Sequence, residues 1–125
     1  SKSKPDTAIF VTDTKEEVER KLKKAYCPEG ETHENPVLEY CRYIIYPLKN
    51  TMVFERPEKF GGTVSYASYA ALEEAFCEKK LHPLDLKTGT ARYVNEILEP
   101  IRLHFEQDEQ AKQLKQAVEA YEVTR

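Results

Sequence analysis

The sequence predicts a mainly α-helical domain of about five helices with one small β-hairpin. Apolar residues recur at spacings of three and four along most of the chain, which is typical of amphipathic helices. Two short β-prone runs flank a turn rich in proline and glycine in "TMVFERPEKFGGTVSY", which indicates a hairpin. With 125 residues, 40% of them hydrophobic, the chain is long enough to bury one core.

The first helix is predicted to begin after Thr14, in "TKEEVERKLKKAYC". Thr14 and Glu17 have the spacing of a capping box, in which each side chain binds the backbone N–H of the other residue. Val18, Leu22 and Tyr26 then recur every fourth residue and form one apolar stripe. The loop "CPEGETHENP" follows, and it is rich in residues that break helices.

The second helix is predicted to begin after Asn35, an N-cap residue, with Pro36 in its first turn. Because its apolar positions are many, we expect it to lie at the centre of the core. These positions are 37, 38, 41, 44, 45 and 48.

The hairpin is predicted from runs 51–55 and 63–66, joined by "RPEKFGG". Ser68 can cap the next helix, "YAALEEAFCEKK". The apolar face of that helix consists of Ala71, Leu72, Ala75 and Phe76.

Pro83 is predicted to begin a long helix over 83–105. Its stripe is Val94, Ile97, Leu98, Ile101 and Phe105. Pro100 should kink it, because the proline ring clashes with the carbonyl of Glu96. We expect a separate last helix over roughly 108–121, which covers apolar surface with Leu114 and Val118 and also carries Tyr121.

Composition excludes several classes of protein. No apolar stretch reaches the length of about 20 residues that a membrane span needs, and the three widely spaced cysteines (27, 41 and 77) argue for a reducing compartment. No cysteine pair has CxxC spacing and the histidines do not cluster beside them, so we expect no metal site.

The net charge of −3 is unevenly distributed: residues 79–105 carry five Lys/Arg against three Asp/Glu, which places any polyanion contact there and on the first helix.

Three features are candidates for binding, and each also has a structural interpretation. The run "RKLKK" could contact phosphates or form the solvated face of a helix. Asp85, in "LHPLDLK", could accept two hydrogen bonds from a guanine edge or only stabilise a helix N-terminus. Phe60, beside two glycines, could stack on a base or fold back onto the helices.

Two other functional classes remain open. A winged-helix-like nucleic-acid or protein-interaction module also has helices around a hairpin, although the helix over 69–79 carries Glu73, Glu74 and Glu78, which duplex phosphates would repel. A complete small enzyme is the other possibility, but the sequence has no paired nucleophile and base, no metal set and no complete phosphate loop.

Several motifs together resemble the C-terminal part of tyrosyl-tRNA synthetase of the archaeal and eukaryotic type. They are "SKSKPDTAIFVTDTKEEVERKLKKAYCPEG", "NPVLEY", "ERPEKFGG" and "KLHPLDLK…NEILEPIR", in family-like order over residues 1–105. "AYCPEG" also resembles the tryptophan enzyme, whereas "RPEKFGG" with "HPLDLK" resembles the tyrosine enzyme.

The resemblance implies an anticodon-binding domain over 14–125. In the family, the first anticodon base, a guanine, stacks on the aromatic that matches Phe60, and the aspartate that matches Asp85 reads its edge. The other residues that the resemblance places at the anticodon are His82, Pro83, Leu84, Tyr26, Cys27 and Pro28, with Lys24 and Lys87 as phosphate contacts. Recognition of an unpaired base by stacking and by its Watson–Crick edge is typical of RNA-binding proteins.

The resemblance also implies what the intact protein does. Residues 1–13 would be a linker with the end of the ATP-binding KMSKS loop, of which Ser1, Lys2 and Ser3 remain. An upstream Rossmann-type domain would attach tyrosine to tRNA-Tyr with ATP and magnesium, and would form a homodimer. We therefore expect a cytoplasmic ligase whose fragment here is inactive alone and needs no cofactor.

Overall fold

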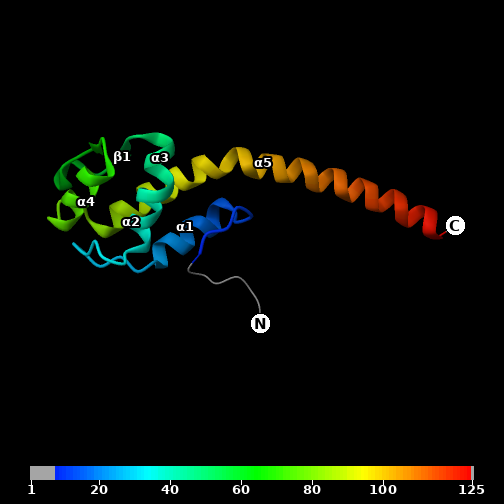
Figure 1. Ribbon diagram of the computed structural model, residues 1–125, viewed down its shortest axis with the longest axis horizontal. Coiled ribbons are helices and arrows are strands. Elements are labelled where there is room, and N and C mark those ends of the chain that lie inside the picture. The colour runs from blue at the N-terminus through cyan, green and yellow to red at the C-terminus, as the bar shows by residue number, and fades with distance from the viewer. Residues whose placement is uncertain (1–7, 125) are drawn as a thin grey trace.

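The computed structural model describes residues 8–124, except for some side chains late in the last helix. This part of the chain is mainly helical, with one two-stranded sheet, as predicted. A compact body contains every element except the distal part of the last helix, which projects away from it (Figure 1). The elements are α1 (Lys15–Lys24), α2 (Pro36–Tyr40), η1 (Cys41–Ile45), α3 (Tyr46–Lys49), β1 (Met52–Phe54), η2 (Glu58–Phe60), β2 (Val64–Tyr66), α4 (Tyr69–Cys77) and α5 (Pro83–Thr124).

The three predicted N-caps are confirmed. Thr14 and Glu17 form both hydrogen bonds of the capping box at the start of α1. Asn35 accepts hydrogen bonds from the backbone at the start of α2, and Ser68 does so at the start of α4. Each of these side chains satisfies backbone N–H groups that have no partner within the helix, which explains why the helices begin at these positions.

Helix α1 packs antiparallel to the first half of α5, and long-range hydrogen bonds join both ends of the pair. Near the end of α1, Lys87 Nζ donates to the carbonyl oxygen of Lys23 at 2.8 Å. Near its start, Arg102 Nε donates to the carbonyl oxygen of Asp13 at 3.0 Å. The Asp13 carboxylate in turn forms a buried ion pair with Lys21 at 2.7 Å, which attaches the segment before α1 to the helix.

The second predicted helix contains a π-helical turn, η1, which changes its buried face. The N–H of Tyr46 donates to the carbonyl of Cys41, five residues back, so the chain is wound more loosely here than in an α-helix. Ile45 and Tyr46 are therefore buried. The predicted core positions Ile44 and Leu48 are exposed, because a strict α-helical period no longer applies after Cys41.

The hairpin is confirmed, and it packs against α5. Strands β1 and β2 are antiparallel, with Val53 paired to Ser65. Phe54, at the end of β1, is almost fully buried, and its ring lies against Gly89 of α5. A side chain at position 89 would collide with this ring, so the glycine permits the close approach.

The prediction of a separate helix over 108–121 is wrong, since α5 runs unbroken from Pro83 to Thr124. Pro100 lies inside it and removes one hydrogen bond, yet the helix continues. The residues that follow are mostly strong helix formers, and no glycine or capping sequence stops them.

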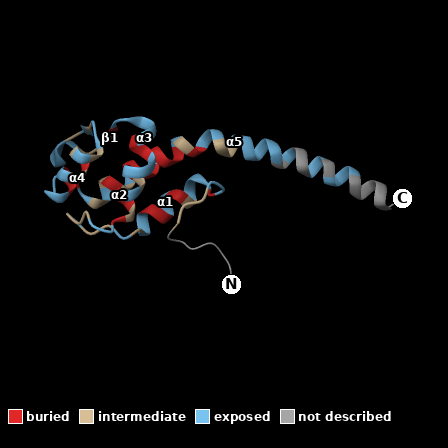
Figure 2. Ribbon diagram, viewed as in Figure 1, coloured by how far each residue is buried: buried red, intermediate tan, exposed pale blue. Residues whose placement is uncertain are grey.

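The distal part of α5 covers no apolar surface of the described residues, contrary to prediction. Leu114 and Val118 are exposed, and so is Phe105 at the end of the predicted stripe. Figure 2 shows buried residues only in the compact body and in the half of α5 that crosses it. The side chain of Tyr121 lies outside the described part of the chain.

The core is formed by the apolar faces of α1, α2, α4 and the first half of α5, together with the hairpin. Val18 and Leu22 come from α1, Leu72 and Phe76 from α4, and all four are fully buried as predicted. Tyr26, the third residue of the predicted α1 stripe, is instead exposed, because α1 ends at Lys24 and Ala25 is extended.

Candidate nucleic-acid interface

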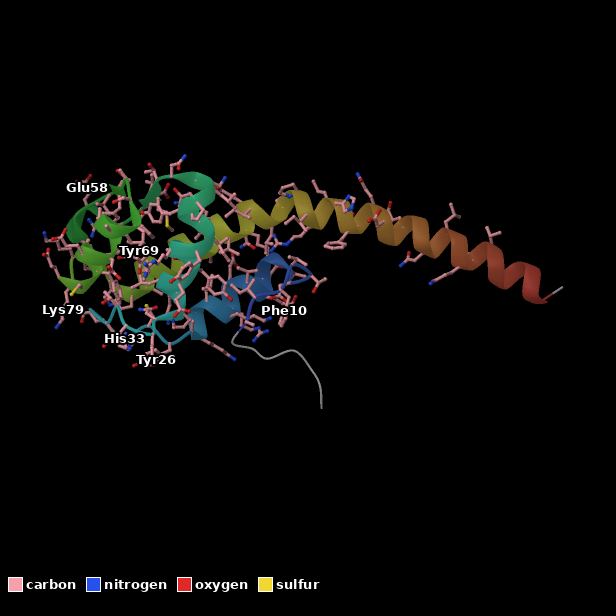
Figure 3. All side chains as sticks on the ribbon, viewed as in Figure 1. Phe10, Tyr26, His33, Glu58, Tyr69 and Lys79 are labelled. Atoms are coloured by element: carbon pink, nitrogen blue, oxygen red, sulfur yellow. The ribbon has the colours of Figure 1, made fainter. Side chains whose placement is uncertain are left out.

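Three loops and the N-terminus of α5 meet at the end of the body opposite the C-terminus. Arg56, in the hairpin loop, donates through Nη1 to the carbonyl of Lys80, just before α5. Gly30, in the loop after α1, lies against Lys79 and the carbonyl of Cys77. Figure 3 shows Glu58 and Lys79 at this end and Tyr26 at the lower edge of the same half of the body, and they come from the three loops.

The N-terminus of α5 is capped by His82. Its Nδ1 accepts a hydrogen bond from the N–H of Leu84 at 3.0 Å, and its carbonyl accepts one from Leu86. Pro83 occupies the first turn, where its missing N–H costs nothing. The exposed imidazole of His82 is thus held at the helix start by its own backbone neighbours.

Asp85 lies in the first turn of α5 and is half-buried. A carboxylate at this position is stabilised by the positive end of the helix dipole. Within the described residues its oxygens have no hydrogen-bond or ion-pair partner. A carboxylate that is fixed on a rigid helix and retains free acceptor positions can receive two N–H donors from a ligand.

Phe60 points into solvent and does not fold back onto the helices. The residue is 61% exposed at the end of η2, and the Lys59 ammonium lies 5.1 Å from the centre of its ring. Arg56 fixes the loop by donating from Nε to the carbonyl of Gly62 at 2.8 Å. Gly61 has a φ of 109°, and a β-carbon there would lie 2.6 Å from an Arg56 nitrogen, so glycine is required.

The loop after α1 brings Tyr26, Cys27 and Pro28 to the same end. Tyr26 is exposed, whereas Cys27 and Pro28 are half-buried. Asn35 Nδ2 lies 3.4 Å from the Cys27 sulfur. Burial raises the pKa of the Cys27 thiol, while the Asn35 hydrogen bond and then the positive charge of Lys87 act in the opposite direction.

The two predicted phosphate contacts differ in their surroundings. Lys24 is exposed at the end of α1. Lys87 is half-buried and already donates to the carbonyl of Lys23. Within the described part of the chain, no hydrogen bond, ion pair or ring contact joins Phe60 directly to Asp85; the Arg56–Lys80 hydrogen bond connects their loops instead. Ser1, Lys2 and Ser3 lie outside the described residues.

The sequence did not single out a groove between α1 and α5, with a volume of about 1000 Å³. Basic side chains from α1, α3 and α5 line it, and Asn95 of α5 also contributes to its wall. The lysines spaced along the polar face of α1 were the only sequence feature that could have indicated this groove. The groove itself forms only because α5 packs against α1. Among the residues that the structure describes, no three His, Cys, Asp or Glu side chains gather in a manner suited to a metal ion.

The family model for class I tRNA synthetases of the tryptophan and tyrosine type matches residues 1–99. This chain belongs to that family. It is 48% identical over 118 residues to the tyrosine–tRNA ligase of Saccharolobus islandicus. The aligned region covers 94% of this chain and 33% of that protein. It is 54% identical over 100 residues to that of Methanosarcina barkeri, covering 80% of this chain and 32% of the relative.

Solved structures of the family have the same fold. Tyrosyl-tRNA synthetase from Pyrococcus horikoshii, complexed with L-tyrosine, is 44% identical and superposes with a TM-score of 0.81, covering 93% of this chain and 32% of the other. The enzyme from Archaeoglobus fulgidus is 53% identical and superposes with a TM-score of 0.72. This match covers 73% of this chain and 28% of the other. The chain therefore spans about a third of the length of the relatives that it matches.

Within the described residues, no helix has the length and apolar content to cross a membrane.

The surface at the α5 N-terminus has the chemistry to bind an unpaired nucleotide. It combines an exposed aromatic ring, a carboxylate that has no partner among the described residues, and ammonium groups at the edge.

Proposed function

We propose that this chain is the C-terminal, anticodon-recognition part of a tyrosine–tRNA ligase and that it prefers guanine at the first anticodon position. The intact ligase would attach tyrosine to tRNA-Tyr in the cytoplasm with ATP and magnesium. An upstream Rossmann-type domain would carry this chemistry and the homodimer interface, and the chain alone would be inactive.

One observation supports the base-specific part of this proposal most strongly. Phe60 is exposed on a loop that Arg56 ties to the start of α5, and the oxygens of Asp85 at that start accept no hydrogen bond from any residue that the structure describes. Guanine presents two donors, N1–H and N2–H, on its Watson–Crick edge, and a carboxylate can accept both. Base stacking on the ring of Phe60 would supply affinity, and Asp85 would supply the preference.

The winged-helix alternative is not favoured. Such a module would need a basic recognition helix. Helix α4, the candidate, instead carries Glu73 and Glu74.

The proposal is tested with the chain and four anticodon stem-loops of tRNA-Tyr that differ only in the first anticodon base. We expect fluorescence anisotropy to show tightest binding to guanine, by the roughly 5–150-fold that a good bidentate pair of about 1–3 kcal/mol provides. Asp85→Asn should abolish the preference, because the amide replaces one acceptor with a donor. Glu58→Gln, which removes an exposed carboxylate near Phe60, should preserve it. Equal affinity of the unaltered chain for all four bases would refute the proposal.

A further inference from the structure

The groove between α1 and α5 begins at the proposed anticodon site. Leu84 and Lys87 line it, and they flank Asp85 in sequence. From there it follows α5 as far as Arg102, a distance of about 27 Å at the helical rise per residue. Since α1 runs antiparallel to α5, Lys23 lies at the anticodon end of the groove and Lys15 toward the other.

The groove has an excess of positive charge. Six Lys/Arg line it against three Glu. Glu96 lies 3.6 Å from the Lys49 ammonium, and Glu99 lies 3.6 Å from the Arg102 guanidinium, so two of the carboxylates are already balanced. Lys21 of α1 is paired with Asp13, but Lys15 and Lys23, the α1 lysines that line the groove, form no ion pair within the described residues. Their ammonium groups remain available along the rim.

Asn95, in the groove wall, has an unsatisfied donor. The residue is 8% exposed, and its Oδ1 accepts a hydrogen bond from Arg102 Nη2 at 2.7 Å. This bond fixes the orientation of the amide, and Nδ2 then has no acceptor among the described residues. A buried donor without a partner is unfavourable, so its presence beside a basic groove indicates an acceptor that comes from a ligand. Because Nδ2 lies beneath the surface, rim side chains must reorient to admit that acceptor.

We infer that this groove binds the sugar–phosphate backbone of the anticodon stem, with a phosphate oxygen as the acceptor for Asn95. The inference rests on the proposed function, because continuity with the anticodon site is what favours RNA over an acidic peptide. The rim lysines contact phosphates without reading sequence, whereas Asp85 reads the base. Backbone contacts of this kind set position and affinity.

The contribution of the rim is tested by replacing two lysines at a time. Lys15→Gln/Lys23→Gln should weaken binding of the anticodon stem-loop about 3- to 10-fold at low salt, and should reduce the slope of log K against log salt by roughly one to two. Lys112→Gln/Lys115→Gln removes the same charge from a stretch of sequence ten or more residues past Arg102 and should change neither. The isolated seven-nucleotide loop should bind both double variants equally.

Asn95 gives a readout that charge alone would not change. In a ¹⁵N spectrum, its side-chain NH₂ resonances should shift when the stem-loop is added, and should shift much less with the isolated loop. An unchanged Asn95 signal at saturation, or an unchanged salt slope in the Lys15/Lys23 variant, would overturn the groove inference even if the guanine preference holds. Stem binding through the groove with no base preference would instead refute the proposed function. If an acidic peptide shifts Asn95 as strongly as the stem-loop does, RNA is not its ligand.

Discussion

Arg56 Nη1 donates a hydrogen bond of 2.9 Å to the carbonyl oxygen of Lys80, 24 residues further along the chain. Through this bond the hairpin loop that carries Phe60 is held beside the segment that leads into Asp85. The same guanidinium donates to the carbonyl of Gly62 within the hairpin loop. One side chain therefore holds the loop in shape and also attaches it to the segment before α5.

Arg56→Lys should therefore weaken binding of the anticodon stem-loop although Arg56 itself need not touch RNA. The lysine ammonium lacks the planar guanidinium that donates to two carbonyls at once. The hairpin loop is then less ordered in the free protein and must become ordered when RNA binds. We expect about a tenfold loss of affinity, since ordering one or two side chains costs roughly 0.5–1.5 kcal/mol each. Lys59→Arg, a reciprocal change in the same loop, is the control. Undiminished affinity in Arg56→Lys would show that the loop needs no such anchor.

Phe60→Ala should reduce RNA affinity without reducing stability. The exposed ring contributes little to the core, and substitutions at such surface sites usually change the free energy of unfolding by less than about 0.5 kcal/mol. Loss of base stacking should cost about 1–3 kcal/mol of binding. Phe60→Tyr retains an aromatic face and should bind nearly as well as the unaltered chain. Titration calorimetry and urea unfolding together separate the two effects, and a large loss of stability would contradict the structure.

Gly89→Ala should destabilise the fold by about 1–3 kcal/mol, the usual effect of overpacking a core. Alanine favours a helix by about 1 kcal/mol over glycine, but the added methyl group would collide with the buried ring of Phe54. Replacing Phe54 by Leu in the Gly89→Ala background should recover part of the loss, because it removes the clash. Urea unfolding of the two single variants and the double variant measures this coupling. If Gly89→Ala alone stabilises the chain, the close approach of β1 to α5 is wrong.

Alkaline pH should destabilise the protein partly through Cys41. Burial raises the pKa of this thiol from 9.0 to about 12, although a contact with Thr90 opposes the shift. The unfolded chain releases the proton first, so this contribution to stability is complete below pH 9 and declines as the pH rises from 9 toward 12. Burial of Tyr46 raises the pKa of its hydroxyl and adds to the same trend.

The pH dependence can be assigned with cysteine variants. Urea unfolding at pH 8, 9 and 10 should show a weaker decline for Cys41→Val than for the unaltered chain, because valine cannot ionise. Cys77→Ser changes an exposed thiol and should follow the unaltered chain. Identical slopes for Cys41→Val and the unaltered chain would show that Cys41 is not responsible.

The sequence by itself determined the features that depend on a few neighbouring residues. Thr14, Asn35 and Ser68 start their helices because each cap is completed within three residues. The hairpin follows from two β-prone runs around a glycine-rich turn. Phe60 and Asp85 could be named as candidates, since their residue types and motifs are local. Their exposure, and the meeting of their loops, could not be derived in this way.

Only the tertiary structure decided the features that depend on distant partners. The π-turn after Cys41 turns Ile44 and Leu48 to the surface, because packing against α5 and the hairpin selects Ile45 and Tyr46 for the core. Asn95 Nδ2 has no acceptor within the described part of the chain, and the amide is held in this orientation because Arg102, seven residues away, binds its oxygen while also reaching back to Asp13. The surroundings of Asn95 and Arg102 depend on the packing of α1 on α5, which brings together segments tens of residues apart. A local sequence pattern cannot predict a contact between such distant segments.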